Sequence, residues 1–117
     1  MIKQIDAANL ILELVKADEV CLVMFSSPLC QPCKALKPVI EEFAETCEVN
    51  CYEVDTTKES NFELVNHFRV QMVPTTFFCS PGCLSEDGDW KVTPLPKMFT
   101  VVQLIEEFTQ LEERNER

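Results

Sequence analysis

Short apolar runs predict the buried strands of this chain. The clearest run covers residues 20–25, which are apolar without interruption, the pattern of a central strand buried on both faces. Weaker runs, rich in apolar and β-branched residues, predict four further strands. The expected strands cover residues 2–5, 20–25, 49–54, 75–79 and 90–92.

Between these strands, apolar residues recur at the spacing of amphipathic helices. Asp6 is placed to cap the first helix. Further helices are expected over residues 33–46 and 58–68, and Thr100 with Gln103 forms a capping box before the last helix. The residues expected to face inward are Leu10, Ile11, Leu14 and Val15; Leu36, Ile40 and Phe43; Phe62, Val65 and Phe68; and Val101, Leu104, Ile105, Phe108 and Leu111.

The predicted element order is β-α-β-α-β-α-β-β-α. Helices that separate the first strands imply parallel pairing with right-handed crossovers. Residues 80–83 carry a Pro-Gly turn signal and residues 84–89 are mostly polar, so the last two strands are expected to pair antiparallel. We therefore predict an α/β fold with a central mixed sheet flanked by helices on both faces, in a single domain over residues 1–117.

Charge and composition exclude several functional classes. The 117-residue chain carries 10 Lys and Arg against 20 Asp and Glu, a formal net charge of −10. Such a chain lacks the clustered positive charge by which proteins bind nucleic acids or anionic membranes. Its two glycines, Gly82 and Gly88, cannot form a dinucleotide fingerprint or a phosphate-binding loop. The longest apolar run is strand-sized, so no membrane-spanning segment is expected.

The cysteine content points to a reducing compartment. Seven cysteines are an odd number and do not close into a full set of disulfides. The 46% hydrophobic content is enough for a core without disulfide staples. No signal-type apolar run begins before Asp6. We therefore expect a cytoplasmic protein in which most thiols are free and one pair is catalytic.

The candidate catalytic pair is Cys30-Gln31-Pro32-Cys33, between a predicted buried strand and a predicted helix. Sites of parallel sheets lie at the carboxyl ends of the strands, so this is where chemistry is expected. Residues three apart on a helix are neighbours, which lets Cys30 and Cys33 form a small disulfide ring. The free amides of the helix N-terminus favour a thiolate on Cys30. We expect Cys30 to attack a substrate disulfide and the more buried Cys33 to resolve the mixed disulfide.

Other interpretations of the motif remain open. A C-x-x-C is also half of a zinc site, or a chance spacing in a cysteine-rich chain. We exclude a four-cysteine site that includes Cys79 and Cys83, because five strand residues place Cys79 about 15 Å from the dithiol, far beyond a zinc–sulfur bond. A non-catalytic binding module that holds a protein partner in a groove beside Pro74 is the second functional hypothesis.

The chain resembles the thioredoxin family over essentially its whole length. The strand ending at Phe25, the Cys-Gln-Pro-Cys motif, the helix interrupted by Pro38, and Val73-Pro74-Thr75 follow the spacing of that family. The resemblance implies a thioredoxin-like fold, thiol–disulfide oxidoreductase activity through Cys30 and Cys33, and a cis peptide bond before Pro74. It also implies that Pro74 shapes the substrate groove. The other residues expected to bind substrate are Leu29, Gln31, Pro32 and Val73.

The resemblance also implies how the protein works with others. The redox-active cysteine pair serves as its own redox centre, so we expect no metal and no other cofactor. The expected partners are proteins that contain disulfides and an external reductase that donates electrons. We expect a monomer that takes part in electron transport and cell redox homeostasis.

The chain departs from the family at positions around the dithiol. Leu29 and Ser26 stand where the family usually has tryptophans, and Gln31 replaces a glycine. Met24 occupies the place of a buried aspartate beneath the resolving cysteine, and Cys51 the place of a lysine that often partners it. Without a carboxylate beneath it, Cys33 is expected to lose its proton with difficulty and to resolve slowly.

The remaining cysteines receive no catalytic role. Cys21 begins the central strand and Cys79 ends its expected antiparallel neighbour, so the two are expected to lie close together. We interpret them as small hydrophobic core residues. Cys79 and Cys83 could instead form a local disulfide or a separate thiol sensor. Cys47 and Cys51 flank the entry to a strand, and we assign them no function.

Overall fold

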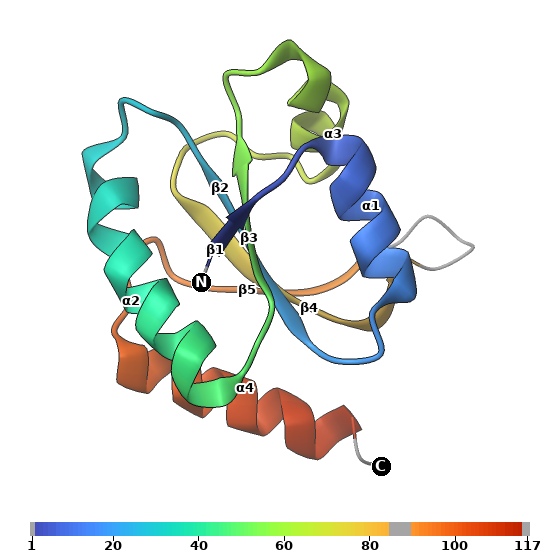
Figure 1. Ribbon diagram of the computed structural model, residues 1–117, viewed down its shortest axis with the longest axis vertical. Coiled ribbons are helices and arrows are strands. Elements are labelled where there is room, and N and C mark those ends of the chain that lie inside the picture. The colour runs from blue at the N-terminus through green and yellow to red at the C-terminus, as the bar shows by residue number, and fades with distance from the viewer. Residues whose placement is uncertain (1, 85–89, 116–117) are drawn as a thin grey trace.

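A five-stranded sheet with the strand order β1-β3-β2-β4-β5 organises the chain (Figure 1). The computed structural model describes residues 2–84 and 90–115. The strands are β1 Ile2–Gln4, β2 Cys21–Ser26, β3 Cys51–Asp55, β4 Thr75–Leu84 and β5 Trp90–Pro94. The helices are α1 Ala7–Lys16, α2 Gln31–Cys47, the short 3-10 helix η1 Glu59–Asn61, α3 Phe62–His67 and α4 Val101–Asn115.

The strand pairing agrees with the predicted mixed sheet. β3 pairs in parallel with both β1 and β2. β4 pairs antiparallel with β2 and with β5. The predicted α/β class, the element order and the central position of β2 are therefore confirmed.

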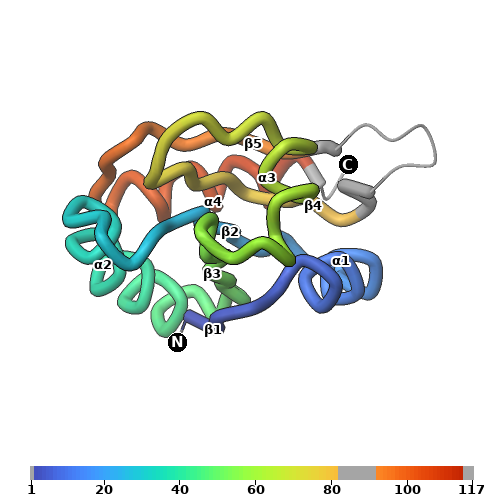
Figure 2. The backbone as a smooth tube through the Cα atoms, turned by 90° about the horizontal axis from the view of Figure 1, so that it is seen from above, coloured from blue at the N-terminus to red at the C-terminus, as the bar shows by residue number. Residues whose placement is uncertain are grey.

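The two faces of the sheet are covered by different helices. On one face, Leu36, Ile40 and Phe43 of α2 and Leu104 of α4 pack with alternate residues of the strands. On the other face, α1 and α3 pack on the intervening strand residues. In Figure 2, α1 and α2 lie at opposite sides of the sheet. Because both faces are covered, every residue of β2 is buried, as its unbroken apolar run predicts.

Helix α2 begins two residues earlier than the sequence pattern predicts. Its N-cap is Cys30, and Pro32 lies in the first turn, where a residue without an N–H is tolerated. Pro38 lies inside the helix, as expected. The chain leaves the helix through Glu48, which takes a left-handed conformation with φ 54°. The start of α2 fixes both cysteines of the motif relative to the end of β2.

The predicted turn over residues 80–83 is wrong. Strand β4 continues to Leu84, which pairs with Trp90 of β5, and the register shifts between Cys79 and Leu84. The irregular register accommodates the Pro-Gly sequence within the strand, so pairing with β5 overrides the local turn signal. Of the predicted polar loop, residues 85–89 lie outside the described residues. Strand β5 extends two residues beyond its predicted end.

Two helices bury fewer residues than their apolar stripes predict. The exposed residues are Ile11 and Val15 of α1 and Phe62 of α3. In α3, the buried residue is Leu64. The helix expected over residues 58–68 is divided into η1 and the short α3. The last helix follows the prediction: the Thr100 N–H donates to Gln103 Oε1 at 2.8 Å, and the Gln103 N–H donates to Thr100 Oγ1 at 3.2 Å. None of the helices in the described ranges is long and apolar enough to cross a membrane.

Candidate active site

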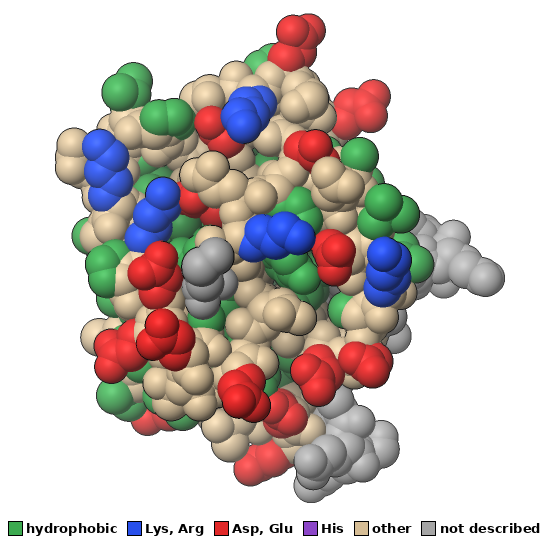
Figure 3. Space-filling view, in the orientation of Figure 1, with side chains coloured by type: hydrophobic (Ala, Val, Ile, Leu, Met, Phe, Trp, Pro, Cys, Tyr) green, Lys and Arg blue, Asp and Glu red, His purple; other side chains and the backbone are tan. Residues whose placement is uncertain are grey.

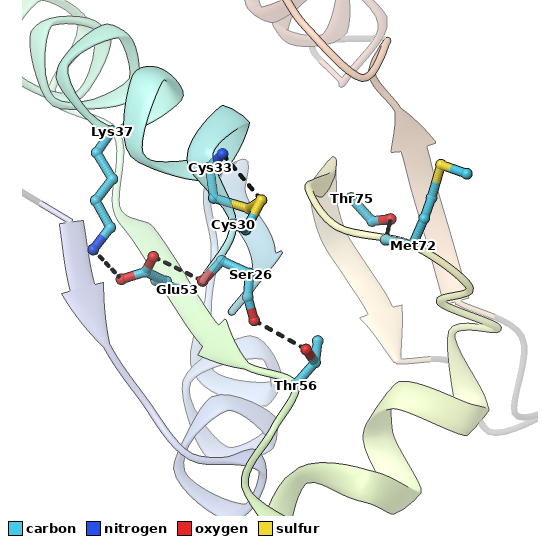
Figure 4. The surroundings of a disulfide bond; sticks show 8 residues. All are labelled: Ser26, Cys30, Cys33, Lys37, Glu53, Thr56, Met72 and Thr75. Carbon is cyan, nitrogen blue, oxygen red and sulfur yellow. Dashed lines mark hydrogen bonds and ion pairs between the residues drawn. A yellow bond between two sulfur atoms is a disulfide. The ribbon is translucent and has the colours of Figure 1, made fainter. Parts of the chain in front are cut away.

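The candidate dithiol lies where β2 passes into α2 (Figure 4). A tight turn connects the two elements, in which the Cys30 N–H donates to the Ser27 carbonyl at 3.1 Å. Cys30 and Cys33 form a disulfide, and their Cα atoms are 5.3 Å apart. The Cys33 N–H donates to Cys30 Sγ at 3.2 Å, so a free amide of the helix N-terminus is directed at that sulfur. The same amide would stabilise a Cys30 thiolate when the bond is reduced.

The two sulfur-bearing residues differ in their access to solvent. Cys30 is 8% exposed and Cys33 is 1% exposed. Leu29, which precedes the motif, is 90% exposed, and Gln31 and Pro32 are exposed as well. A disulfide partner that approaches this corner meets Cys30 before Cys33. This order of burial is the one expected for an attacking and a resolving thiol.

The proline loop lies at the same edge of the sheet as the dithiol. The Val73–Pro74 peptide bond is cis, as the family resemblance implies. Thr75, the next residue, is the register partner of Phe25 near the end of β2. Figure 4 shows Thr75 and Met72 across from the disulfide, with the Thr75 hydroxyl donating to the Met72 carbonyl at 2.6 Å. The topology therefore brings the proline loop to the motif.

The residues predicted to bind substrate differ in exposure. Leu29, Gln31 and Pro32 are exposed, Val73 is half-buried and Pro74 is buried. Met72, which the sequence analysis did not select, is 61% exposed. Leu29 and Met72 thus offer large apolar side chains to solvent from the two loops that meet at this edge of the sheet.

A buried carboxylate lies beneath the first turns of α2, and the sequence analysis missed it. Glu53 of β3 is only 5% exposed. Its Oε2 accepts from the Ser26 hydroxyl at 2.8 Å, and its Oε1 accepts from Gln4 Nε2 at 3.1 Å. Lys37 of α2 places Nζ 3.2 Å from Oε1. Figure 4 shows the Ser26 side chain near the disulfide and joined to the carboxylate.

The expectation that Cys33 has no carboxylate beneath it is therefore wrong. Met24 is fully buried in the apolar cluster under α2 and α4, but its register partner on the adjacent parallel strand is Glu53. Register partners lie on the same face of a sheet, about 4.8 Å apart. A single charged residue inside the otherwise apolar sequence Cys51-Tyr52-Glu53-Val54 was the available signal.

A polar cavity adjoins the buried side of the motif. Its volume is about 570 Å³, and Ser26, Cys33, Lys37 and Glu53 are among the residues that line it. In Figure 3, Lys and Arg side chains lie among acidic ones over the centre and upper part of this face, and acidic side chains crowd its lower part. The cavity thus departs from the strongly acidic character of the whole chain.

The other cysteines lie within the sheet or at the far end of α2. Cys21 and Cys79 are register partners on β2 and β4, which confirms that they lie close together. Burial raises the pKa of the Cys51 thiol from its ordinary value of 9.0 to about 12. Burial also raises the pKa of Cys47, and Glu112 adds to the effect. The side chain of Cys83 lies outside the described part of the structure, so its pairing with Cys79 stays a hypothesis.

The arrangement holds the parts of dithiol chemistry. Among the described residues, no three His, Cys, Asp or Glu side chains are grouped in a way that could hold a metal ion. The cavity beside Cys33 instead offers one carboxylate and one hydroxyl in contact with each other. Such a site suits a thiol that must gain and lose a proton out of contact with bulk water.

Comparisons with known proteins agree with this geometry. The family model described as thioredoxin matches residues 1–100. Thioredoxin 2 of Chlorobaculum tepidum is 30% identical over 94 residues, which are 80% of this chain and 84% of that protein. Thioredoxin 1 of Nostoc sp. is 28% identical over 94 residues, again 80% of this chain and 84% of the relative.

A further relative and a solved structure extend the comparison. A Schizosaccharomyces pombe protein with a protein disulfide-isomerase name is 38% identical over 66 residues, 54% of this chain but only 13% of that longer protein. The crystal structure of chloroplastic thioredoxin z superposes with a TM-score of 0.81 at 22% identity and covers 96% of this chain and 95% of that one. At this identity the likeness shows the fold alone. From the family match together with these relatives, the chain belongs to the thioredoxin family, thiol–disulfide oxidoreductases that rely on a cysteine pair and use no cofactor.

Proposed function

We propose that this protein reduces disulfides in protein substrates, with Cys30 as the attacking thiol and Cys33 as the resolving thiol. The observation that carries the proposal is the graded burial of the pair at a helix N-terminus. Cys30 receives the Cys33 amide at 3.2 Å and retains some exposure, while Cys33 is 1% exposed. The amide favours the thiolate of the outer sulfur, and the inner sulfur is kept for the second step.

The surface around the pair supports a protein as the substrate. Leu29 and Met72 expose apolar side chains from the loop before the motif and the loop before Pro74. An extended segment of a partner that lies between these loops would bury both side chains as its disulfide reaches Cys30. Leu29, Gln31, Pro32, Val73 and Pro74 are the residues we propose for this contact.

The reaction needs an electron donor from outside the chain. Each turnover converts the Cys30/Cys33 dithiol to a disulfide and returns two electrons to the substrate as two thiols. An external reductase must then reduce the pair again. The cytoplasmic location and the monomeric state stay predictions that belong to this proposal.

The proposal is tested by the reduction of insulin disulfides with dithiothreitol as the electron source. The wild-type protein should accelerate the reaction, and Cys30→Ser should lower the rate to that of dithiothreitol alone. Cys47→Ser is the matched control, because Cys47 lies at the opposite end of α2 and should leave the rate unchanged. A wild-type protein that does not exceed the background would refute the proposal and favour a non-catalytic binding module.

The direction of electron flow has its own measurement. Equilibration of the Cys30/Cys33 couple against glutathione gives its midpoint potential. A value more negative than about −230 mV supports a reductase, whereas a value near −120 mV would make the protein an oxidant.

A further inference from the structure

Resolution of a mixed disulfide requires Cys33 to lose a proton in a place that bulk water does not reach. This inference rests on the proposed function, in which the Cys33 thiolate attacks Cys30. Cys33 is 1% exposed, and a thiol surrounded by protein is a poor proton donor unless an acceptor lies nearby. The acceptor must therefore belong to the protein or to water held in the adjoining cavity.

Glu53 is the buried carboxylate on the side of the sheet that faces α2. It lies on β3 opposite Met24, and it lines the same cavity as Cys33. The Ser26 hydroxyl donates to Glu53 Oε2 at 2.8 Å. Because its proton is directed at Glu53, the Ser26 oxygen keeps its lone pairs for a donor on the dithiol side. In Figure 4 the Ser26 side chain lies below the disulfide and beside the carboxylate, and Ser26, Cys33 and Glu53 line the same cavity.

Four lysines line the cavity around Glu53. Lys37 and Lys34 line the cavity from α2, Lys3 from β1, and Lys58 from the segment after β3. Of these four cations, the structure pairs Lys37 with Glu53, at 3.2 Å.

The other carboxylates that line the cavity are Asp6, Glu13 and Asp55. Asp6 caps α1 and accepts from the Asn9 N–H, and Asp55 accepts from the N–H and the hydroxyl of Thr57. Glu13 lies on α1 and is half-buried. Glu53 therefore combines burial with a hydroxyl link toward the dithiol.

We propose that Glu53 accepts the proton of Cys33 through the Ser26 hydroxyl. Glu53 on β3 thus takes the role of the buried aspartate whose place on β2 is occupied by Met24. Glu53 and Ser26 act on the sulfur through a relay and do not touch the substrate. Gln4 and Lys37 hold the carboxylate in place from the two elements on either side.

The proton and electron balance of the step is complete without another reactant. Cys30 is bonded to the substrate sulfur after the first attack. Cys33 passes its proton to the Ser26 oxygen as Ser26 passes its own proton to Glu53. The Cys33 thiolate then attacks Cys30 Sγ, the Cys30–substrate bond breaks, and the substrate leaves as a thiolate. Glu53 returns its proton by the same relay or through the cavity to the departing thiolate, and the enzyme pair is left oxidised.

Reaction of the reduced protein with the aromatic disulfide dithiobis(nitrobenzoate) separates the two steps. The first attack releases one coloured thiolate at a rate that scales with reagent concentration. Resolution by Cys33 releases the second coloured thiolate, at a rate that does not depend on reagent concentration. Cys30→Ser should remove both phases and Cys33→Ser the second alone, which assigns the phases to the site.

Glu53→Gln is the decisive variant, because it keeps the shape of the side chain and one acceptor oxygen for Gln4 or Ser26, but its amide cannot take up a proton. We expect the second phase to slow by about tenfold or more at pH 7, with the first phase unchanged. The difference should narrow as pH rises, because hydroxide then removes the Cys33 proton in both proteins. Ser26→Ala should slow the same phase and keeps the test available if Glu53→Gln does not fold.

Two control variants separate the relay from general effects of charge and packing. Glu41→Gln removes one carboxylate from the exposed side of α2, and it should leave both phases unchanged. Lys37→Gln removes the ion pair but keeps the carboxylate, so its second phase should stay faster than that of Glu53→Gln at pH 7.

The outcomes distinguish this inference from the proposed function. A wild-type protein that never releases the second thiolate contradicts the proposed function itself. If the wild-type protein shows both phases, and the second-phase rate of Glu53→Gln is within twofold of the wild-type rate at every pH, the relay is overturned but the proposed function is not. Equal slowing of both phases, or the same pH profile in Lys37→Gln and Glu53→Gln, would reduce Glu53 to a structural role.

Discussion

The adjacent strands β2 and β3 differ sharply between their first and second halves. On the face toward α2, the first half pairs Leu22 with Cys51, both buried among apolar side chains. The second half pairs Met24 with Glu53 and ends at Ser26, whose hydroxyl contacts that carboxylate. The same two strands therefore build an inert core at one end and a polar site at the other, and a shift of two residues along the strand decides which.

The largest expected difference between the two halves is in thiol reactivity. With its pKa raised to about 12, Cys51 has about a thousandfold less thiolate at neutral pH than a cysteine at the ordinary value of 9.0. Alkylation of the reduced protein with iodoacetamide, followed by peptide mass analysis, should label Cys30 first and leave Cys51 unmodified until the protein unfolds. Rapid labelling of Cys51 in the folded protein would show that the first halves of β2 and β3 are accessible to the reagent, contrary to the comparison.

The two halves should also respond differently to truncation of one β2 side chain. Leu22→Ala removes a fully buried side chain and should lower the free energy of unfolding by about 2–5 kcal/mol, with the dithiol phases retained. Ser26→Ala should cost about 1 kcal/mol, the size of one hydrogen bond, but slow the resolving phase. Denaturant unfolding and single-turnover kinetics on the two variants measure both effects. A slower resolving phase in Leu22→Ala together with a normal one in Ser26→Ala would contradict the comparison.

A further expected difference is a loss of stability at alkaline pH that originates in the first half. Burial raises the pKa of Cys51 from 9.0, and that of Tyr52 from 10.0, to about 12 in each case. The unfolded chain loses these protons first, so this contribution is complete below pH 9 and is lost as pH rises from about 9 to 12.

One such group changes the free energy of unfolding by about 1.4 kcal/mol per pH unit within that window. Urea unfolding of wild-type and Cys51→Val proteins at pH 8 and pH 10 measures the contribution of the thiol. Equal pH dependence in the two proteins would show that Cys51 is not its source.

The sequence predicts the first half of this comparison better than the second. The unbroken apolar run of β2 and the stripe of Leu36, Ile40 and Phe43 indicate burial through local periodicity alone, and both are correct. The dithiol is likewise found from its position at a strand–helix junction. Glu53 was missed because a strand pattern shows which face a residue lies on, but not which side chains of other elements meet it there.

The same limit explains the errors elsewhere in the fold. The Pro-Gly signal at residues 80–83 is a local preference, and it loses to the ladder between β4 and β5. Phe62 fits an apolar stripe, but the division of its helix into η1 and α3 turns it to solvent. In both places, contacts distant in sequence decide the outcome.

The shortest strand of the sheet has a consequence for the site. β1 contains three residues, lies at the edge of the sheet, and supplies the Gln4 amide to Glu53. Edge elements of this length open locally at a lower free energy than the strands inside a sheet. Each such opening would remove the Gln4 donor from the carboxylate, so the local stability of this edge strand would determine how firmly the proposed proton acceptor is held between turnovers.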